Sequence, residues 1–250
     1  MQMKHFPLFF LMTTFLLTIA CQQQPAISSV KQAKSVDDSD NTFYALVCEG
    51  SNDSILICLP DPYDGSDPDT LDILGATHRH RVFGHLYAGD RVAVMRDSTD
   101  SKSASLVIVT QDLLGQWCYK VKPRIRRRAK MVTDSLSQAY GELPDTLRKH
   151  LIAEREYGFT LKADSVAMPI GMRQSRSDEE SLVEYPPLKR YLQWYIRNGQ
   201  LMLVEMTLDS LGNSIPLATD TAELVELTRD TLVLRMSDGL HGYYHKAENE

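Results

Sequence analysis

The sequence lacks the motifs that mark the common hydrolases, nucleotide-binding enzymes and metalloproteases. It contains no Gly-x-Ser-x-Gly elbow, no glycine-rich phosphate loop and no His-Glu-x-x-His helix. It also lacks an extended basic face, and its net charge is −6, which argues against nucleic acid as a partner. We therefore predict no catalytic residues and no cofactor, and we expect that the protein is not an enzyme.

Cysteine is scarce, with four residues in a chain of 250, and none stands in a Cys-x-x-Cys pair or at a zinc-binding spacing. Cys48 and Cys58 lie on either side of Gly50–Ser54, a polar segment typical of a hairpin turn. Two interpretations fit this pair in an oxidising compartment. One is a disulfide across the hairpin, and the other is two buried thiols in neighbouring strands.

Histidine offers one cluster, His78, His80 and His85. In an extended chain the first two project from one face, but His85 lies on the opposite face, and Arg79 and Arg81 add positive charge between them. The sequence therefore predicts solvated histidines rather than a metal site.

Only one long apolar run occurs, at residues 6–19, and Lys4 precedes it. Its length is typical of the core of a signal peptide rather than of a membrane-spanning helix. The run ends in Thr18-Ile19-Ala20-Cys21, which resembles the lipobox of bacterial lipoproteins, although Thr18 stands where the usual pattern has leucine. The resemblance implies that residues 1–20 are removed and that Cys21 is lipidated and anchors the protein to a membrane. The alternative is a plain secretory signal that is cleaved near Ala20.

Residues 21–41 are polar and have almost no apolar periodicity, so we expect a disordered tether. Gln22 follows the cysteine, and by resemblance to other lipoproteins the absence of an acidic residue there favours the outer membrane. We predict a cell-envelope protein on the outer membrane that faces the periplasm or the cell surface.

Residues 42–110 are predicted to form a first folded unit of short strands. Its strand candidates are Phe43–Cys48, Ile55–Leu59, Thr70–Leu74, Arg81–Tyr87, Arg91–Arg96 and Ser105–Val109, separated by segments rich in glycine, aspartate and proline. This rhythm resembles small barrels of the oligonucleotide/oligosaccharide-binding (OB) type, but it predicts no ligand.

Residues 191–246 show the regular pattern of a β-meander. Large apolar residues alternate in Tyr191–Ile196 and again in Leu201–Met206. Asn198-Gly199 separates these two segments, and this dipeptide favours a tight hairpin because both residues accept a positive φ.

The second unit, residues 111–250, begins with Gly115-Gln116-Trp117 and continues after Gly158-Phe159-Thr160-Leu161 into the meander. This order resembles the lipocalin-like domains of Bacteroidetes lipoproteins, and the resemblance covers residues 113–246. It implies an antiparallel barrel in which Trp117 closes the base. The charged, helix-periodic residues of about 124–156 depart from the compact family pattern and predict a helical insertion. The predicted fold is thus mainly β, an OB-like barrel followed by a lipocalin-like barrel.

Two groups of residues are candidate sites in this second unit. Apolar residues that could line a ligand cavity, or equally form a plain core, are Trp117, Phe159, Trp194, Leu203 and Val233. A basic cluster consists of Arg124, Arg126, Arg127 and Arg128. Such a cluster could contact an anion, but solvated surface charge is the commoner explanation.

The leading functional hypothesis is a membrane-anchored lipoprotein that is not an enzyme and whose barrel binds a small hydrophobic or amphipathic ligand. The first alternative is an envelope assembly protein that docks onto a protein partner and holds no small ligand. The second alternative is an envelope hydrolase.

Overall fold

The computed structural model describes residues 40–125, 152–171 and 183–247, with isolated positions between 138 and 149. All of them belong to one unit, Ser39–Glu250. The predicted signal segment, Cys21, nearly all of the predicted tether, Arg126, Arg127, Arg128 and most of the predicted helical insertion lie outside the described residues.

The first sheet is built from residues 42–109. Its strands are β1 (Thr42–Val47), β2 (Ile55–Pro60), β3 (Asp69–Asp72), β4 (Val82–Phe83), β5 (Arg91–Arg96) and β6 (Ala104–Val109). They follow the order β3-β2-β1-β5-β6-β4. Asp72 at the end of β3 also forms a parallel bridge with Ser103 beside β6, so five of the strands curl into a partly open barrel of the predicted OB-like kind.

The segment between β3 and β5 differs from the sequence-based prediction. The predicted strand at residues 70–74 ends at Asp72, and the helix α1 (Leu74–His78) follows it. The predicted strand at residues 81–87 is only β4, because Gly84 adopts a φ of 91° and turns the chain away from the sheet.

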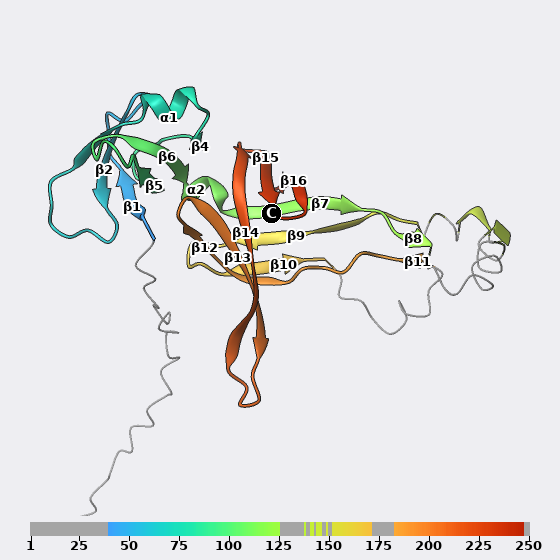
Figure 1. The fold of residues 1–250 in the computed structure, drawn as a ribbon. Helices are drawn as coiled ribbons and strands as arrows, with labels where there is room; N and C mark the ends of the chain where they lie inside the picture. Colours follow the sequence, from blue (N-terminus) through green and yellow to red (C-terminus); the bar gives the residue numbers. More distant parts are fainter. Residues whose placement is uncertain are drawn as a thin grey trace, which may run out of the picture. The chain divides into compact units, whose positions relative to one another are not determined.

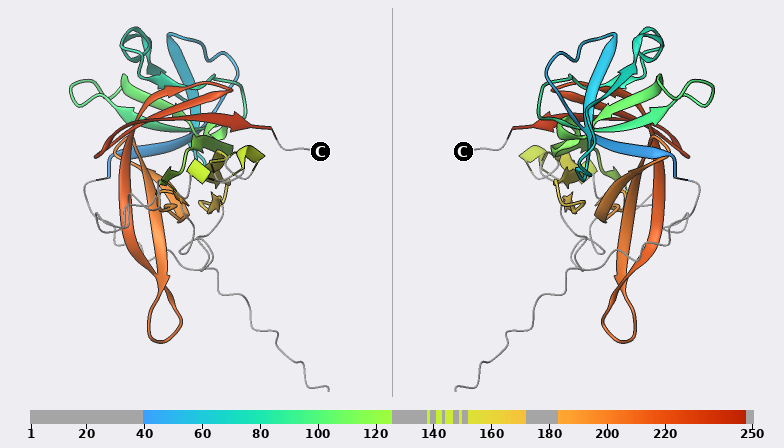
Figure 2. Two further views of the ribbon diagram at one scale, coloured as in Figure 1. Left: turned by 90° about the vertical axis from the view of Figure 1, so that its right-hand side faces the viewer. Right: turned by 90° about the vertical axis from the view of Figure 1, so that its left-hand side faces the viewer.

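The second sheet contains eight antiparallel strands. They are β7 (Gly115–Val121), β9 (Arg155–Leu161), β10 (Ala167–Ile170), β12 (Tyr191–Arg197), β13 (Gln200–Leu208), β14 (Ser214–Leu227), β15 (Thr231–Met236) and β16 (Gly239–Lys246). Across the sheet the strands follow the order β10-β9-β7-β16-β15-β14-β13-β12. Strands that are adjacent in the sheet are therefore also adjacent along the chain, except that the last strand, β16, pairs with the first, β7. A bridge between Val166 and Gln193 brings β10 to β12, so the barrel is nearly closed (Figures 1 and 2).

A short two-stranded sheet pairs β8 (Arg124–Ile125) with β11 (Val183–Glu184). The helical insertion predicted for about residues 124–156 therefore begins and ends in strands, since β9 already starts at Arg155. The ladder from β7 to β9 explains this boundary, because Lys120 pairs with Glu156 and Val121 with Arg155.

The predicted hairpin at Asn198-Gly199 is confirmed. Asn198 has a φ of 48° and Gly199 a φ of 70°, as a tight two-residue turn between β12 and β13 requires. The register Arg197↔Gln200 and Trp194↔Leu203 follows directly from that turn.

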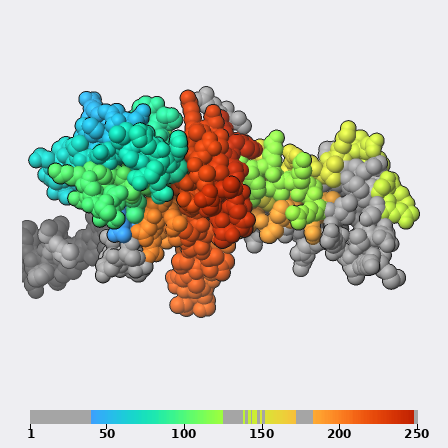
Figure 3. Space-filling view, turned by 45° about the horizontal axis from the view of Figure 1, so that its top comes forward, coloured from blue at the N-terminus to red at the C-terminus, as the bar shows by residue number. Residues whose placement is uncertain are grey.

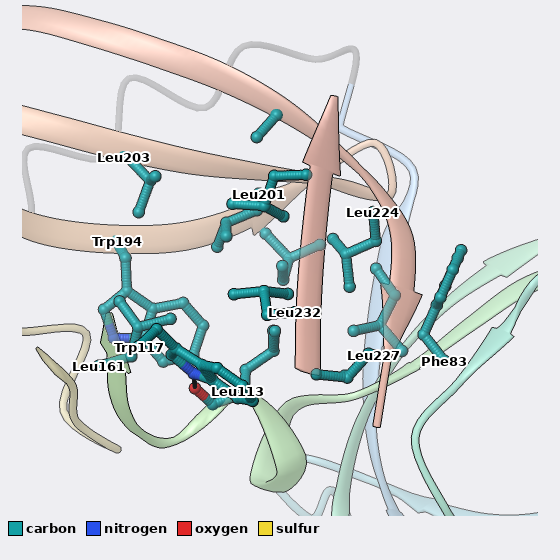
Figure 4. Packing of buried hydrophobic residues seen from close by; sticks show 14 of the residues in the cluster. Phe83, Leu113, Trp117, Leu161, Trp194, Leu201, Leu203, Leu224, Leu227 and Leu232 are labelled. Atoms are coloured by element: carbon teal, nitrogen blue, oxygen red, sulfur yellow. Dashed lines mark hydrogen bonds between the residues drawn. The ribbon is translucent and has the colours of Figure 1, made fainter. Parts of the chain in front are cut away.

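One hydrophobic core joins the first sheet to the barrel (Figure 4). The side chains of Phe83, Leu106 and Ile108 belong to the same buried cluster as Leu201 and Leu224 of the barrel. Tyr44 of β1 adds a polar tie, because its hydroxyl donates to the Ile196 carbonyl at 2.8 Å. The first sheet thus covers one end of the barrel.

Among the described residues, no helix has both the length and the apolar character needed to cross a bilayer.

Candidate functional site

Tryptophans close the covered end of the barrel. The short helix α2 (Thr110–Leu113) leads into β7, and the Trp117 indole N–H donates to the Leu113 carbonyl at 2.8 Å. The Trp194 indole donates to the Lys162 carbonyl at 2.9 Å. The rings of His245 and Trp117 pack edge to face, with their centroids 4.9 Å apart. Both indole N–H groups donate to backbone carbonyls, so no polar group of the two tryptophans is left for a ligand. Packed side chains therefore close this end of the barrel.

The sequence-predicted cavity residues have different environments. Trp117, Phe159, Trp194 and Leu203 all belong to the buried core, where other side chains fill the space around them. Val233 lies apart from this cluster: it is half-buried, whereas its strand neighbours Leu232 and Leu234 are fully buried and point inward. The prediction that Val233 lines the interior is therefore wrong.

Aromatic rings gather toward the other end of the interior. Phe159 contacts the rings of Tyr191 and Tyr243, with centroids 5.9 and 5.0 Å apart. Tyr119 meets Tyr243 at 5.5 Å and Tyr157 at 6.2 Å, both edge-to-face. These rings come from the strands β7, β9, β12 and β16, and they form a continuous aromatic layer above the aliphatic core.

A charged group lies beside this layer. The Tyr191 hydroxyl donates to the Asp220 carboxylate, and Lys189 Nζ donates to the same oxygen at 2.7 Å. Burial alone would raise the pKa of Asp220, but the hydrogen bonds from Lys189 and Tyr191 outweigh it and lower that pKa. Burial, reinforced by the Asp220 carboxylate, raises the pKa of Tyr191 well above its ordinary value. At neutral pH Asp220 is therefore an anion that accepts from a protonated Tyr191.

The barrel wall opens between β7 and β16 at this same end. The two strands pair only at Tyr244↔Cys118, His245↔Trp117 and Lys246↔Gln116, although both continue beyond these pairs. A hollow of about 520 Å³ occupies the split. It is lined by Tyr119, Lys120, Leu240, His241, Gly242, Tyr243 and Tyr244.

Sequence reasoning missed this site, which we call the split hollow. Strand periodicity does predict that Tyr119 faces the interior, because it lies two residues after Trp117 on the same strand face. The separation of β7 from β16 carries no such signal, since the two strands are more than a hundred residues apart in the chain.

The other predicted sites are dispersed. Cys48 and Cys58 are both free thiols, because the register pairs Cys58 with Val47 and leaves the two cysteine side chains on opposite faces of the sheet. Arg124 is exposed in β8.

The three candidate histidines are separated as well. His78 is the last residue of α1, and His80 lies in the turn that follows, with a φ of 54°. His85 lies further on, with its Nδ1 3.8 Å from a carboxylate oxygen of Asp112. The extended segment that would align the first two is absent, and no three potential metal ligands gather within the described part of the chain.

Eight antiparallel strands in up-and-down order define a β-barrel of the lipocalin kind. No family model matches the sequence, and no curated protein matches it. The solved structure of a lipocalin-like protein from Bacteroides thetaiotaomicron is similar over 54% of this chain and 97% of its own, with 16% identity and a TM-score of 0.28.

Proposed function

We propose that this chain is a membrane-anchored lipoprotein that is not an enzyme and that binds a small amphipathic ligand in the split hollow. The observation that carries the proposal is the opening of the barrel wall beside the aromatic layer. Its volume of about 520 Å³ falls within the roughly 300–1,000 Å³ range of small-molecule sites. Because core side chains fill the barrel interior near Trp117, the ligand is expected at the wall rather than on the barrel axis.

The lining suits a ligand with an apolar body and a polar head. The rings of Tyr119 and Tyr243 and the side chain of Leu240 offer apolar contact, while Lys120 and His241 offer polar groups. Burial, then the hydrogen bond to Glu156, raises the pKa of Tyr244 to about 12, so its hydroxyl stays protonated at neutral pH. The site therefore combines tyrosine rings and hydroxyls with the Lys120 side chain, which favours an acyl or aryl chain that ends in a carboxylate or a similar acceptor.

Ligand binding can be tested with a fluorescent fatty acid such as cis-parinaric acid. Leu240→Asp places a charge in the hollow at a position that is 63% exposed, so the fold should tolerate it. We expect the dissociation constant to rise by about tenfold or more. The control is Leu74→Asp, at an exposed position of α1 outside the hollow. Equal affinity for the wild type and for Leu240→Asp would contradict the site.

Anchoring has a separate test. Cys21→Ala should release the exported protein from the membrane fraction into the soluble fraction, because no thiol remains to carry acyl chains. A variant that stays with the membrane would contradict the lipobox interpretation.

Native mass spectrometry of the protein purified from its own membrane separates the ligand carrier from the assembly protein. A bound small molecule whose occupancy falls in Leu240→Asp supports the carrier. A stoichiometric protein partner with no small molecule bound would instead favour envelope assembly.

A further inference from the structure

The end of β13 and the start of β14 leave the barrel as a two-stranded ribbon, residues 206–219 (Figures 1 and 3). Its aliphatic side chains face water: Leu208 is 68% exposed, Leu211 85%, Ile215 41% and Leu217 65%. Asp209 is the one charged residue in this stretch. Exposed aliphatic residues grouped without lysine, arginine or glutamate mark a contact surface rather than a solvated face.

The tip of the ribbon satisfies its own polar groups. The Asp209 carboxylate accepts from the backbone N–H groups of Leu211 and Asn213, both at 2.8 Å, and from the Asn213 amide at 3.0 Å. The backbone N–H of Gly212 donates to the Asp209 carbonyl at 3.1 Å, and that of Asp209 donates to the Asn213 carbonyl at 2.9 Å. With these donors already bound, moving the backbone of the tip out of bulk water breaks few hydrogen bonds with solvent, whereas the Asp209 carboxylate must stay in contact with water or headgroups. Leu211, at the tip, is also the most exposed of the four aliphatic residues.

The strand edges do not favour addition of a protein strand. Pro216 lacks an N–H, and a register shift between Glu205 and Met206 interrupts the ladder beside it. A two-stranded ribbon is also only marginally stable alone in water, so we expect another surface to cover it. That surface should contact the aliphatic side chains rather than pair with the backbone of the ribbon.

The charges at the base of the ribbon indicate the kind of surface. Lys189 binds Asp220, and the Arg190 N–H donates to Glu205 at 3.0 Å, so a polar collar bounds the apolar tip. An apolar end above a charged collar is the charge distribution of an element that rests in a membrane interface.

We propose that the ribbon at residues 206–219 contacts a lipid bilayer, with Leu208, Leu211, Ile215 and Leu217 at the boundary between headgroups and acyl chains. Penetration is shallow, about 5–10 Å, because the free edges of the ribbon need hydrogen-bonding partners that only the headgroup region supplies. The proposal rests on the proposed function in one respect only: the lipid anchor of the lipoprotein brings the ribbon to the bilayer.

The place where the described chain starts, at Asp40, is compatible with that contact. Asp40 and Asn41 bind Asn198 at the far end of β13, so the tip lies roughly 30–40 Å from the point where the described chain starts. Residues 21–40, fully extended, span at most about 65–70 Å, so Cys21 and the ribbon can reach the same membrane.

The test uses the chain from Gln22 onward, which keeps the whole unit Ser39–Glu250 and carries no lipid. We expect it to sediment with phosphatidylethanolamine/phosphatidylglycerol vesicles. The partition coefficient of the double variant L208S/L211S should fall roughly tenfold or more. Leu74→Ser, an exposed leucine in α1, should match the wild type. Because aliphatic side chains drive the contact and the ribbon holds no basic residue, raising the salt concentration should not weaken wild-type binding.

Depth is measured with Leu211→Trp, whose added fluorescence should be quenched most by lipids brominated near the headgroup end of the acyl chain. Equal vesicle binding by the wild type and L208S/L211S would overturn the proposal. So would a solution dimer that the double variant abolishes while vesicle binding is absent, since a second copy would then cover the ribbon. Because Cys21 is missing from this chain, the result is independent of the Cys21→Ala test of anchoring.

Discussion

Replacing Tyr191 by phenylalanine removes one hydroxyl from the charged group at the open end of the barrel. The Tyr191 ring is almost fully buried, at 3% exposure, and its hydroxyl donates to the Asp220 carboxylate. Phenylalanine fills nearly the same volume and keeps the contact with Phe159, so packing should change little. The effect therefore reports the hydrogen bond itself.

The expected loss of stability at neutral pH is about 1.5–3 kcal/mol, the usual contribution of a hydrogen bond to a charged group. In a domain of this size that loss lowers the melting temperature by roughly 3–12 °C. Lys189 still binds Asp220 in the variant, so the carboxylate keeps one partner and the loss should stay within this range.

The pH dependence of the loss follows from the lowered pKa of Asp220. A carboxylate with a lowered pKa stabilises the folded state fully above its unfolded pKa, about 3.9, and loses that contribution as the pH falls through the folded pKa. Without the Tyr191 hydroxyl the folded pKa of Asp220 rises toward its ordinary value. The acid unfolding midpoint should therefore move to higher pH, and the difference in stability should shrink once Asp220 is protonated in both proteins.

Urea unfolding followed by tryptophan fluorescence measures these quantities for the wild type and for Tyr191→Phe, at pH 7 and at successive values below about 4. The control is Tyr195→Phe, a half-buried tyrosine of the same strand outside this group. A difference below about 0.5 kcal/mol at pH 7, or one that grows as the solution becomes acidic, would refute the assignment of Asp220 as the anionic acceptor.

Two further predictions concern the sheet backbone and the thiols. Gly158→Ala would place its Cβ 1.9 Å from the Trp117 carbonyl oxygen, so β7 and β9 must separate. We expect a loss of about 3 kcal/mol or more in urea unfolding, against little change for Gly242→Ala, whose Cβ meets open space; equal stabilities would contradict the close approach. Burial raises the pKa of Cys58 to about 11, so iodoacetamide at pH 8 should modify Cys48 and spare Cys58 until the protein unfolds. Mass spectrometry checks this, and resistance of both thiols before reduction would indicate the disulfide instead.

The hairpins of the barrel could be predicted because their signals are local. Asn198-Gly199 defines both the turn and the register on either side, and alternation in Tyr191–Ile196 then indicates the buried face. The same reasoning failed at Val233. The segment Leu232-Val233-Leu234 is apolar throughout, so composition does not say which residues point inward.

The open end could not be predicted because it depends on contacts between distant segments. Tyr191 meets Asp220 across 29 residues, and the split hollow lies between β7 and β16. Neither aspartate nor tyrosine is unusual in a strand, so the sequence offers no reason to single them out before the register is known. The aliphatic ribbon could not be predicted for a different reason: Leu208, Ile215 and Leu217 lie in strands, where apolar residues normally predict a core face.

The two ends of the barrel differ in a way that limits where a ligand can bind. At the covered end both tryptophan N–H groups are bound to backbone carbonyls, and Phe83 and Leu106 of the first sheet pack against the barrel. A ligand there would have to displace buried side chains whose contacts are already complete. At the open end the ladder between β7 and β16 has already ended, so a ligand can take up unpaired strand edge and aromatic surface without displacing core side chains. The end that holds the Asp220 group should therefore respond to a ligand, and the end that holds Trp117 should not.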